Sequence, residues 1–254
     1  MKNCRMAVAL CCFCFAALLP CGLEAAEPAS LWRRDALNFS GYSWDVKSGY
    51  YHPGKNHWSA RNVWVDEAGW LHLRLAYDGE LWQCAEISTG IFGYGLYRFY
   101  IAGRIDQMDA QTVFGLFLYP GPRLPYEANA EIDIEFSRWG RPEALMGNFS
   151  VIPATVKFPI ELNGEYSTHQ FLWLPDRVEF SSYHGDGELN ESTLISRRIF
   201  RKNGTQSLPT PHLQLHINYW LFKGRPPVSN LPQEILIRKV EYLPFRDEPA
   251  GEGP

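Results

Sequence analysis

The sequence predicts an all-β protein in which antiparallel strands pack as a sandwich or a barrel. Two observations predict this class. From Leu31 onward, apolar residues recur with a period of two, as in "WLHLRLAYDG", and no stretch has the apolar spacing of a helix over three turns. These short segments are also separated by Gly, Pro, Asn and Asp, which form the turns between antiparallel strands.

The strands are expected one after another along the chain. In "WLHLRLAYDG", Leu71, Leu73 and Leu75 alternate with polar residues, and a turn pair follows. "LWQCAEIS" places Trp82, Cys84 and Glu86 on one face of the next strand. Further strands are expected in "YGLYRFYIAGRI", "TVFGLFLYPGP", "HLQLHINYWLF" and "EILIRKVEYLPF".

Two further segments have their own signals. "QFLWLPDRVEFSSYHGDGE" predicts a hairpin, because Pro175-Asp176 suits the centre of a type I turn. The segment from Ser40 to Ala60 is rich in Gly, Tyr and His, and we expect it to be a loop.

The N-terminus has the layout of an export signal. Lys2 and Arg5 precede an apolar run, Met6 to Leu19, that is too short to be a transmembrane helix. We expect residues 1–26 to be a signal peptide, residues 27–245 one β-sandwich domain, and residues 246–254 a disordered tail. The protein should be secreted or periplasmic, and lipid anchoring at Cys21 is the less favoured alternative.

Composition and charge narrow the function. Five of the six cysteines lie in the expected leader, so Cys84 alone remains, and neither an intrachain disulfide nor a cysteine-based zinc site is possible. The net charge is −4 and no basic stretch occurs, which argues against nucleic acid as a partner. Nine Trp and thirteen Tyr suit the stacking of sugar rings. We expect a monomer without membrane span, metal or cofactor.

Three acids alternate with apolar residues in "NAEIDIEF". Side chains at every second position of a strand share a face, so Glu131, Asp133 and Glu135 should project together while the residues between them face the core. A solvated strand face is the simpler interpretation. It does not explain three like charges about 7 Å apart, where each disfavours ionisation of the others.

The spacing suits glycosidic bond cleavage. The Cα atoms of Glu131 and Glu135 should lie about 13 Å apart, and side chains leaning together bring the carboxyl groups to about 5–6 Å. A retaining glycosidase works at this separation, with one carboxylate attacking the anomeric carbon and one acid protonating the leaving oxygen. Asp133 between them should help to keep one neighbour protonated near neutral pH.

"EIDIEF" resembles the active-site strand of the family 16 glycoside hydrolases, the lichenase, laminarinase and xyloglucan transglycosylase group. "FGYGLYRF", "TVFGLFLYPG", "HQFLWLPDRVEFSSYHG" and "INYW" are similar to other strands of that family, so the likeness runs from about Trp82 to Tyr242. The resemblance implies an antiparallel β-jelly-roll sandwich of the concanavalin A-like lectin/glucanase type, with the acidic strand on its concave sheet.

The resemblance also implies roles for individual residues. Glu131 would be the nucleophile, Glu135 the acid/base, and Asp133 their assistant. The implied substrate contacts are Glu86, Phe117, Tyr119, Asn148, Asn218 and Trp220. The chain departs from the family at Asn129, where a Trp is usual, and at Ser88, where an Arg is expected.

The chain also lacks the extra residue between Asp133 and Glu135 that makes a bulge in laminarinase-type members, which favours the lichenase and transglycosylase branch.

Two more residues are candidates for substrate binding. Every second position of one expected strand is polar or aromatic: His212, Gln214, His216, Asn218 and Trp220. His216 should therefore share a face with Asn218 and Trp220, where it could contact substrate or the acidic cluster. A hydrogen-bonded structural role is the usual one for a lone His.

Trp139, just past the acidic strand, could be a sugar platform or a cap on the sandwich. Metal ligands with sensible spacing are not found in the sequence.

These observations predict an exported, retaining endo-β-glycosidase that acts on a β-glucan-type polysaccharide without a cofactor. A transglycosylase with the same residues is one alternative, and a non-catalytic carbohydrate-binding lectin on the same sandwich is another. The loops Pro120 to Asn129 and Tyr42 to Ala60 should decide which polysaccharide is bound.

Overall fold

The structure is a computed structural model that describes residues 29–121, 130–143, 146–203 and 207–246. The expected signal peptide, Cys21 and Asn129 lie outside the described residues, as do most of the expected tail and most of the loop before the acidic strand.

Seventeen strands and four short 3-10 helices form in the described residues. The strands of the N-terminal half are β1 (Trp32–Phe39), β2 (Tyr42–Lys47), β3 (Gly49–Tyr51), β4 (Asn56–Trp58), β5 (Val63–Val65), β6 (Leu71–Tyr77), β7 (Trp82–Phe92), β8 (Gly95–Ala102) and β9 (Thr112–Tyr119). Those of the C-terminal half are β10 (Ile132–Ser137), β11 (Met146–Val151), β12 (Ala154–Pro159), β13 (Tyr166–Trp173), β14 (Arg177–His184), β15 (Leu194–Arg201), β16 (Leu213–Leu221) and β17 (Gln233–Pro244). The 3-10 helices are η1 (Ala29–Leu31), η2 (Ala60–Asn62), η3 (Ile105–Gln107) and η4 (Phe222–Gly224).

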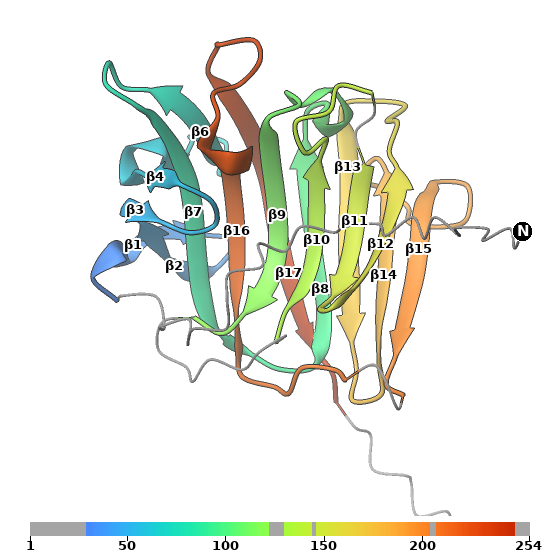
Figure 1. Cartoon of the computed structure of the whole chain (residues 1–254). Helices are drawn as coiled ribbons and strands as arrows, with labels where there is room; N and C mark the ends of the chain where they lie inside the picture. The colour runs from blue at the N-terminus through green and yellow to red at the C-terminus, as the bar shows by residue number, and fades with distance from the viewer. Residues whose placement is uncertain (1–28, 122–129, 144–145, 204–206, 247–254) are drawn as a thin grey trace, which may run out of the picture.

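The strands form two packed layers (Figure 1). The front layer runs β1-β2-β7-β16-β9-β10-β11-β12, and every neighbouring pair in it is antiparallel. The back layer runs β5-β6-β17-β8-β13-β14-β15, again antiparallel throughout. Strand β7 joins the layers, because its first residues pair with β6 and β4 and its later residues with β2 and β16. The expected antiparallel sandwich is confirmed, and the barrel is not formed.

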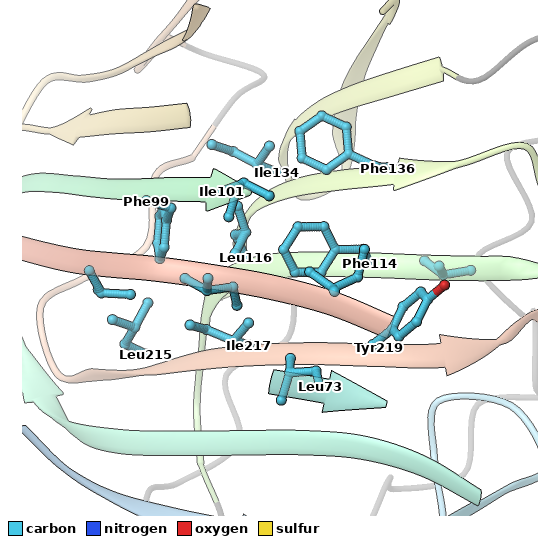
Figure 2. Packing of buried hydrophobic residues seen from close by; sticks show 14 of the residues in the cluster. Leu73, Phe99, Ile101, Phe114, Leu116, Ile134, Phe136, Leu215, Ile217 and Tyr219 are labelled. Carbon is cyan, nitrogen blue, oxygen red and sulfur yellow. The ribbon is translucent and has the colours of Figure 1, made fainter. Parts of the chain in front are cut away.

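The core fills the space between the layers (Figure 2). Ile134 and Phe136 from β10 meet Phe99 and Ile101 from β8 within one cluster of buried apolar side chains. Burying each such side chain contributes about 1.5–3 kcal/mol. This contribution explains why the period-two pattern sets which face of each strand points inward.

Several predicted details are confirmed. Leu71, Leu73 and Leu75 of β6 are all fully buried, as their alternation requires. Strands β13 and β14 form the expected hairpin, in which the backbone N–H of Leu174 donates to the carbonyl of Arg177 at 2.8 Å across the turn.

The prediction of a loop from Ser40 to Ala60 is wrong. This segment contains β2, β3 and β4, and Trp44 and Val46 of β2 are buried while Asp45 between them is partly exposed. The Gly, Tyr and His content obscured a short alternating pattern. His212 is a smaller correction: it precedes β16 with φ of 100°, so the strand begins one residue later than expected.

Candidate active site

Polar side chains of the front layer gather on the face that points away from the core. Strand register places them in two neighbouring rows that cross five strands. One row is Asn148, Glu135, Gly115, Asn218 and Glu86. The next row is Ser150, Asp133, Phe117, His216 and Ser88. The sheet therefore brings residues from five separate segments onto one surface.

The acidic strand is regular. Ile132 to Ser137 pair without a register shift with both β9 and β11, so the predicted absence of a bulge is confirmed. Glu131 lies just before the strand, but its carbonyl accepts a hydrogen bond from the N–H of Ile152 at 3.2 Å. Ile132, Ile134 and Phe136 point into the core, as predicted, which leaves the three acids on the outer face.

The three acids hold protons more tightly than free carboxyl groups do. Burial raises the pKa of Glu131 to about 8, and the charge of Glu135 adds to the rise. Burial also raises the pKa of Glu135 to about 7. Asp133 is 4% exposed, and burial followed by the charges of both neighbours raises its pKa furthest. Glu131 and Glu135 remain partly exposed, so their ends can meet a ligand.

The middle acid is bonded to one neighbour. The Asp133 and Glu135 side chains share a hydrogen bond that raises the pKa of Asp133 and lowers that of Glu135, so the proton lies on Asp133. Lys157 on β12 lowers the pKa of Glu135 further. The bond from Asp133 therefore favours an ionised Glu135, whereas the sequence predicted that Asp133 would help to keep one neighbour protonated.

A glycine makes room beside Glu135. Gly115 of β9 pairs with Glu135 on one side and with Asn218 on the other. A Cβ at this position would come within 2.7 Å of Asn218 Oδ1, so the amide of Asn218 fills the space over the glycine. Asn218 Oδ1 is buried and has no hydrogen-bond partner among the residues that the structure describes. The sheet thus leaves an unpaired acceptor next to the acidic strand.

Glu86, in contrast to the three acids, is bonded to a basic side chain at each of its two carboxylate oxygens. Its Oε2 lies 2.9 Å from Lys47 Nζ, and its Oε1 lies 3.2 Å from His216 Nδ1. Burial alone would raise the pKa of Glu86, but Lys47 and His216 outweigh it and hold the pKa below its usual value. Glu86 is 3% exposed and lies in the same row as Glu135, and both of its oxygens already bind protein.

Sequence reasoning missed Lys47, the cation that neutralises Glu86. Its ammonium donates to the carbonyl of His52 at 2.8 Å and lies 4.5 Å from the ring centre of Trp58 and 5.4 Å from that of Trp32. Such aromatic faces stabilise a buried cation. The alternation in "WDVK" could have indicated that Lys47 and Asp45 share a face, but the segment was expected to be a loop.

Trp139 takes a strained backbone conformation just after β10. Its φ is 52°, a region that bulky residues rarely adopt, and its N–H donates to Ser137 Oγ at 2.9 Å. The ring meets Trp220 and Phe222 edge to face, with centroid distances of 6.5 and 5.4 Å. Trp139 is partly exposed, so it forms an aromatic group at one end of the polar face.

The other predicted residues also lie on this face. Phe117 and Tyr119 are partly exposed, and Phe117 stacks on His216 with ring centroids 5.0 Å apart. Asn148 is buried and donates to the carbonyl of Glu135 at 3.3 Å. Trp220 is buried too. In the described part of the chain, His216 contacts Glu86 and three aromatic rings and does not contact the three acids.

The described residues contain neither a candidate metal cluster nor a candidate membrane-spanning helix. No group of three or more His, Cys, Asp or Glu side chains there could hold a metal ion. No helix there has the length and apolar character needed to cross a bilayer.

Solved β-glucanases share this antiparallel jelly-roll sandwich. No protein-family model and no curated protein matches the sequence. The solved β-glucanase of Bacillus licheniformis superposes with a TM-score of 0.61 at 20% identity, over 85% of this chain and 97% of that one. A family 16 endo-glucanase from Bacteroides ovatus superposes with a TM-score of 0.58 at 12% identity, over 84% and 99%.

A third solved structure is described as an immunostimulatory antigen and pseudo β-1,3-glucanase of Mycobacterium tuberculosis, with a TM-score of 0.58 at 14% identity over 89% and 96% of the two chains. The predicted resemblance to the family 16 glycoside hydrolases is confirmed for the jelly-roll fold.

Proposed function

We propose that the protein is a retaining endo-β-glycosidase that cleaves a β-glucan-type polysaccharide. One observation carries the proposal: Glu131, Asp133 and Glu135 lie on one sheet face, close enough for each to change the pKa of another. Partly exposed Phe117 and Tyr119 on the next strand offer rings for sugar stacking. The β-glucanases with the same fold support the choice of substrate class.

Each carboxyl group has a step in the proposed mechanism. The carboxylate of Glu131 attacks the anomeric carbon, the bond to the leaving sugar breaks, and Glu135 donates its proton to the leaving oxygen. Water then displaces Glu131 from the sugar, giving up a proton to Glu135, and the starting configuration is restored. Asp133, bonded to Glu135, holds that carboxyl group in place through both steps.

Substrate must change the proton distribution of the free protein. Burial raises the pKa of Glu131 to about 8 and that of Glu135 to about 7, so both glutamates hold protons near neutral pH, while the mechanism needs Glu131 ionised. Positive charge developing on the sugar stabilises a carboxylate at Glu131. An ionised Glu131 in turn favours the proton on Glu135, because like charges repel.

A substrate panel tests the proposal. Wild type, Glu131→Gln and Glu135→Gln are assayed on mixed-linkage glucan, laminarin and xyloglucan, and NMR reads the anomeric configuration of the first product. Azide then separates the two roles: rescue of Glu131→Gln should give the glycosyl azide of inverted configuration, and rescue of Glu135→Gln that of retained configuration. Wild-type products of inverted configuration would refute the mechanism.

A non-catalytic glucan-binding protein is the second candidate. The pseudo β-1,3-glucanase with a similar fold favours it. Calorimetry that detects glucan binding while no polysaccharide in the panel is cut would select this candidate. Transfer of sugar to an added oligosaccharide, measured by mass spectrometry, would instead select a transglycosylase.

We also propose that the protein acts outside the cytoplasm after removal of residues 1–26. The support is the charged start and the apolar run of the leader. N-terminal sequencing of the protein recovered from the culture medium and from cell fractions tests this proposal. A lipid-modified N-terminus at Cys21 would select the anchored alternative.

A further inference from the structure

A buried network of three ionisable side chains lies in the same sheet as the acidic strand, with β9 between them. Lys47, Glu86 and His216 come from β2, β7 and β16 and are 2%, 3% and 2% exposed. Within the described residues, both oxygens of Glu86, the ammonium of Lys47 and Nδ1 of His216 all have partners. Nε2 of His216 is buried and has no partner in the described part of the chain. Because an unpaired buried polar atom is costly, this atom is the open position of the network.

The chemistry of Nε2 follows from its partner at the other ring nitrogen. Ionised Glu86 accepts hydrogen bonds only, so Nδ1 of His216 must carry a proton and donate. In the neutral ring Nε2 then accepts, and in the charged ring it donates. A sugar hydroxyl fits both states, because it can donate as well as accept.

His216 lies two strands away from Asp133 in the same sheet. His216 pairs with Phe117 on β9, and Phe117 pairs with Asp133 on β10. Two strand spacings amount to about 10 Å, which is too far for His216 to contact Asp133 directly. The ring of Phe117 lies between them, stacked on His216 at an interplanar angle of 22°.

We propose that His216 Nε2 binds a hydroxyl group of a β-glucan sugar in a subsite next to the reacting linkage, an inference that rests on the proposed function. The ring of Tyr119 is nearly perpendicular to the imidazole at a centroid distance of 6.3 Å, and Tyr119 is partly exposed. Turning of the Tyr119 ring admits the hydroxyl. Lys47 and Glu86 act behind His216 as positioning residues that fix its ring and the proton on Nδ1.

Two isosteric variants separate sugar binding from a structural role. The side-chain amide of His216→Asn can replace Nδ1 and bind Glu86, but it has nothing at the position of Nε2. His216→Gln places its amide near Nε2 and loses the bond to Glu86. We expect His216→Asn to keep the wild-type Tm and raise KM for mixed-linkage glucan about tenfold, with kcat within twofold. His216→Gln should lower Tm and keep KM within about threefold.

Other results overturn the inference. If KM stays at the wild-type value in His216→Asn, the open position holds only water. If His216→Asn behaves as wild type while His216→Gln loses both Tm and affinity, the histidine has a structural role alone. Should His216→Gln fail to fold, the KM of His216→Asn decides. Failure of the proposed function is distinct, because wild type would then cut no polysaccharide, and the same variants would be compared by calorimetry with a mixed-linkage glucan tetrasaccharide.

Discussion

Two groups of acidic side chains on one sheet face, the three acids and Glu86, have pKa values that are shifted in opposite directions. Glu131, Asp133 and Glu135 share β10 and its adjoining residue, and burial raises all three pKa values. Glu86, in the same row as Glu135, also loses water contact, yet its pKa is lowered. The difference is Lys47, which contacts Glu86 directly. Desolvation acts alike on both groups, so the charge of the nearest partner decides the sign.

The comparison separates two kinds of function. The carboxyl groups of the acidic strand hold protons near neutral pH, as proton transfer to a leaving group requires. The Lys47, Glu86 and His216 network keeps its charges paired, which orients side chains and leaves one ring nitrogen open. Five variants can break or sharpen this contrast, and they are described from the largest expected effect to the smallest.

The largest effect is expected from the acidic strand. Glu135→Gln should lower kcat/KM by roughly 10²–10⁴-fold, because it removes proton transfer to the leaving oxygen. Steady-state assays on the best polysaccharide of the panel measure the loss. Glu241→Gln, which changes an acid paired with Tyr100 and Lys239 on the back layer, is the matched control and should leave kcat/KM unchanged. A fully active Glu135→Gln would contradict the proposed mechanism.

Lys47→Met should destabilise the fold by about 3–5 kcal/mol, because it leaves Glu86 as a buried charge without its main partner. Urea unfolding at pH 7 measures the change. The control is Lys239→Met, which removes an exposed ion pair with Glu241 and should cost under about 1 kcal/mol. Equal effects of the two variants would mean that the buried pair has no special importance.

The pH dependence of stability should have opposite signs in the two groups. Between its ordinary pKa of 4.5 and about 8, Glu131 holds a proton in the folded protein that the unfolded chain has released, so stability falls as pH rises. The free energy of unfolding of Glu131→Gln should therefore exceed that of wild type by on the order of 2 kcal/mol at pH 8 and by almost nothing at pH 4.

Glu86→Gln is the counterpart. The lowered pKa of Glu86 contributes stability that is present above pH 4.5 and lost as pH falls through the folded pKa. This variant should therefore be destabilised at pH 7 and much less at acidic pH. Urea unfolding at several pH values tests both, and a common sign for Glu131→Gln and Glu86→Gln at high pH would refute the contrast.

The smallest effect is expected from Lys157, an exposed residue that lowers the pKa of Glu135. Lys157→Met should raise that pKa and shift the corresponding limb of the pH–rate profile upward by a few tenths of a pH unit, since solvent screens the charge. Lys202→Met, an exposed lysine next to β15 at the end of the back layer, should leave the profile in place. A downward shift of this limb in Lys157→Met would contradict the conclusion that Lys157 lowers the pKa of Glu135.

The amino-acid sequence alone determined the layered sheet and the common face of the three acids. Period-two alternation is a local property, so Ile134 between Asp133 and Glu135 already fixes which side faces the core. Only the tertiary structure decided whether the pKa of each acid is raised or lowered. Lys47 and His216 lie 39 and 130 positions from Glu86 in the chain, and no local pattern joins them. Because a pKa depends on the charges and water nearby in space, these acidities follow from the packed sheet and not from the order of residues.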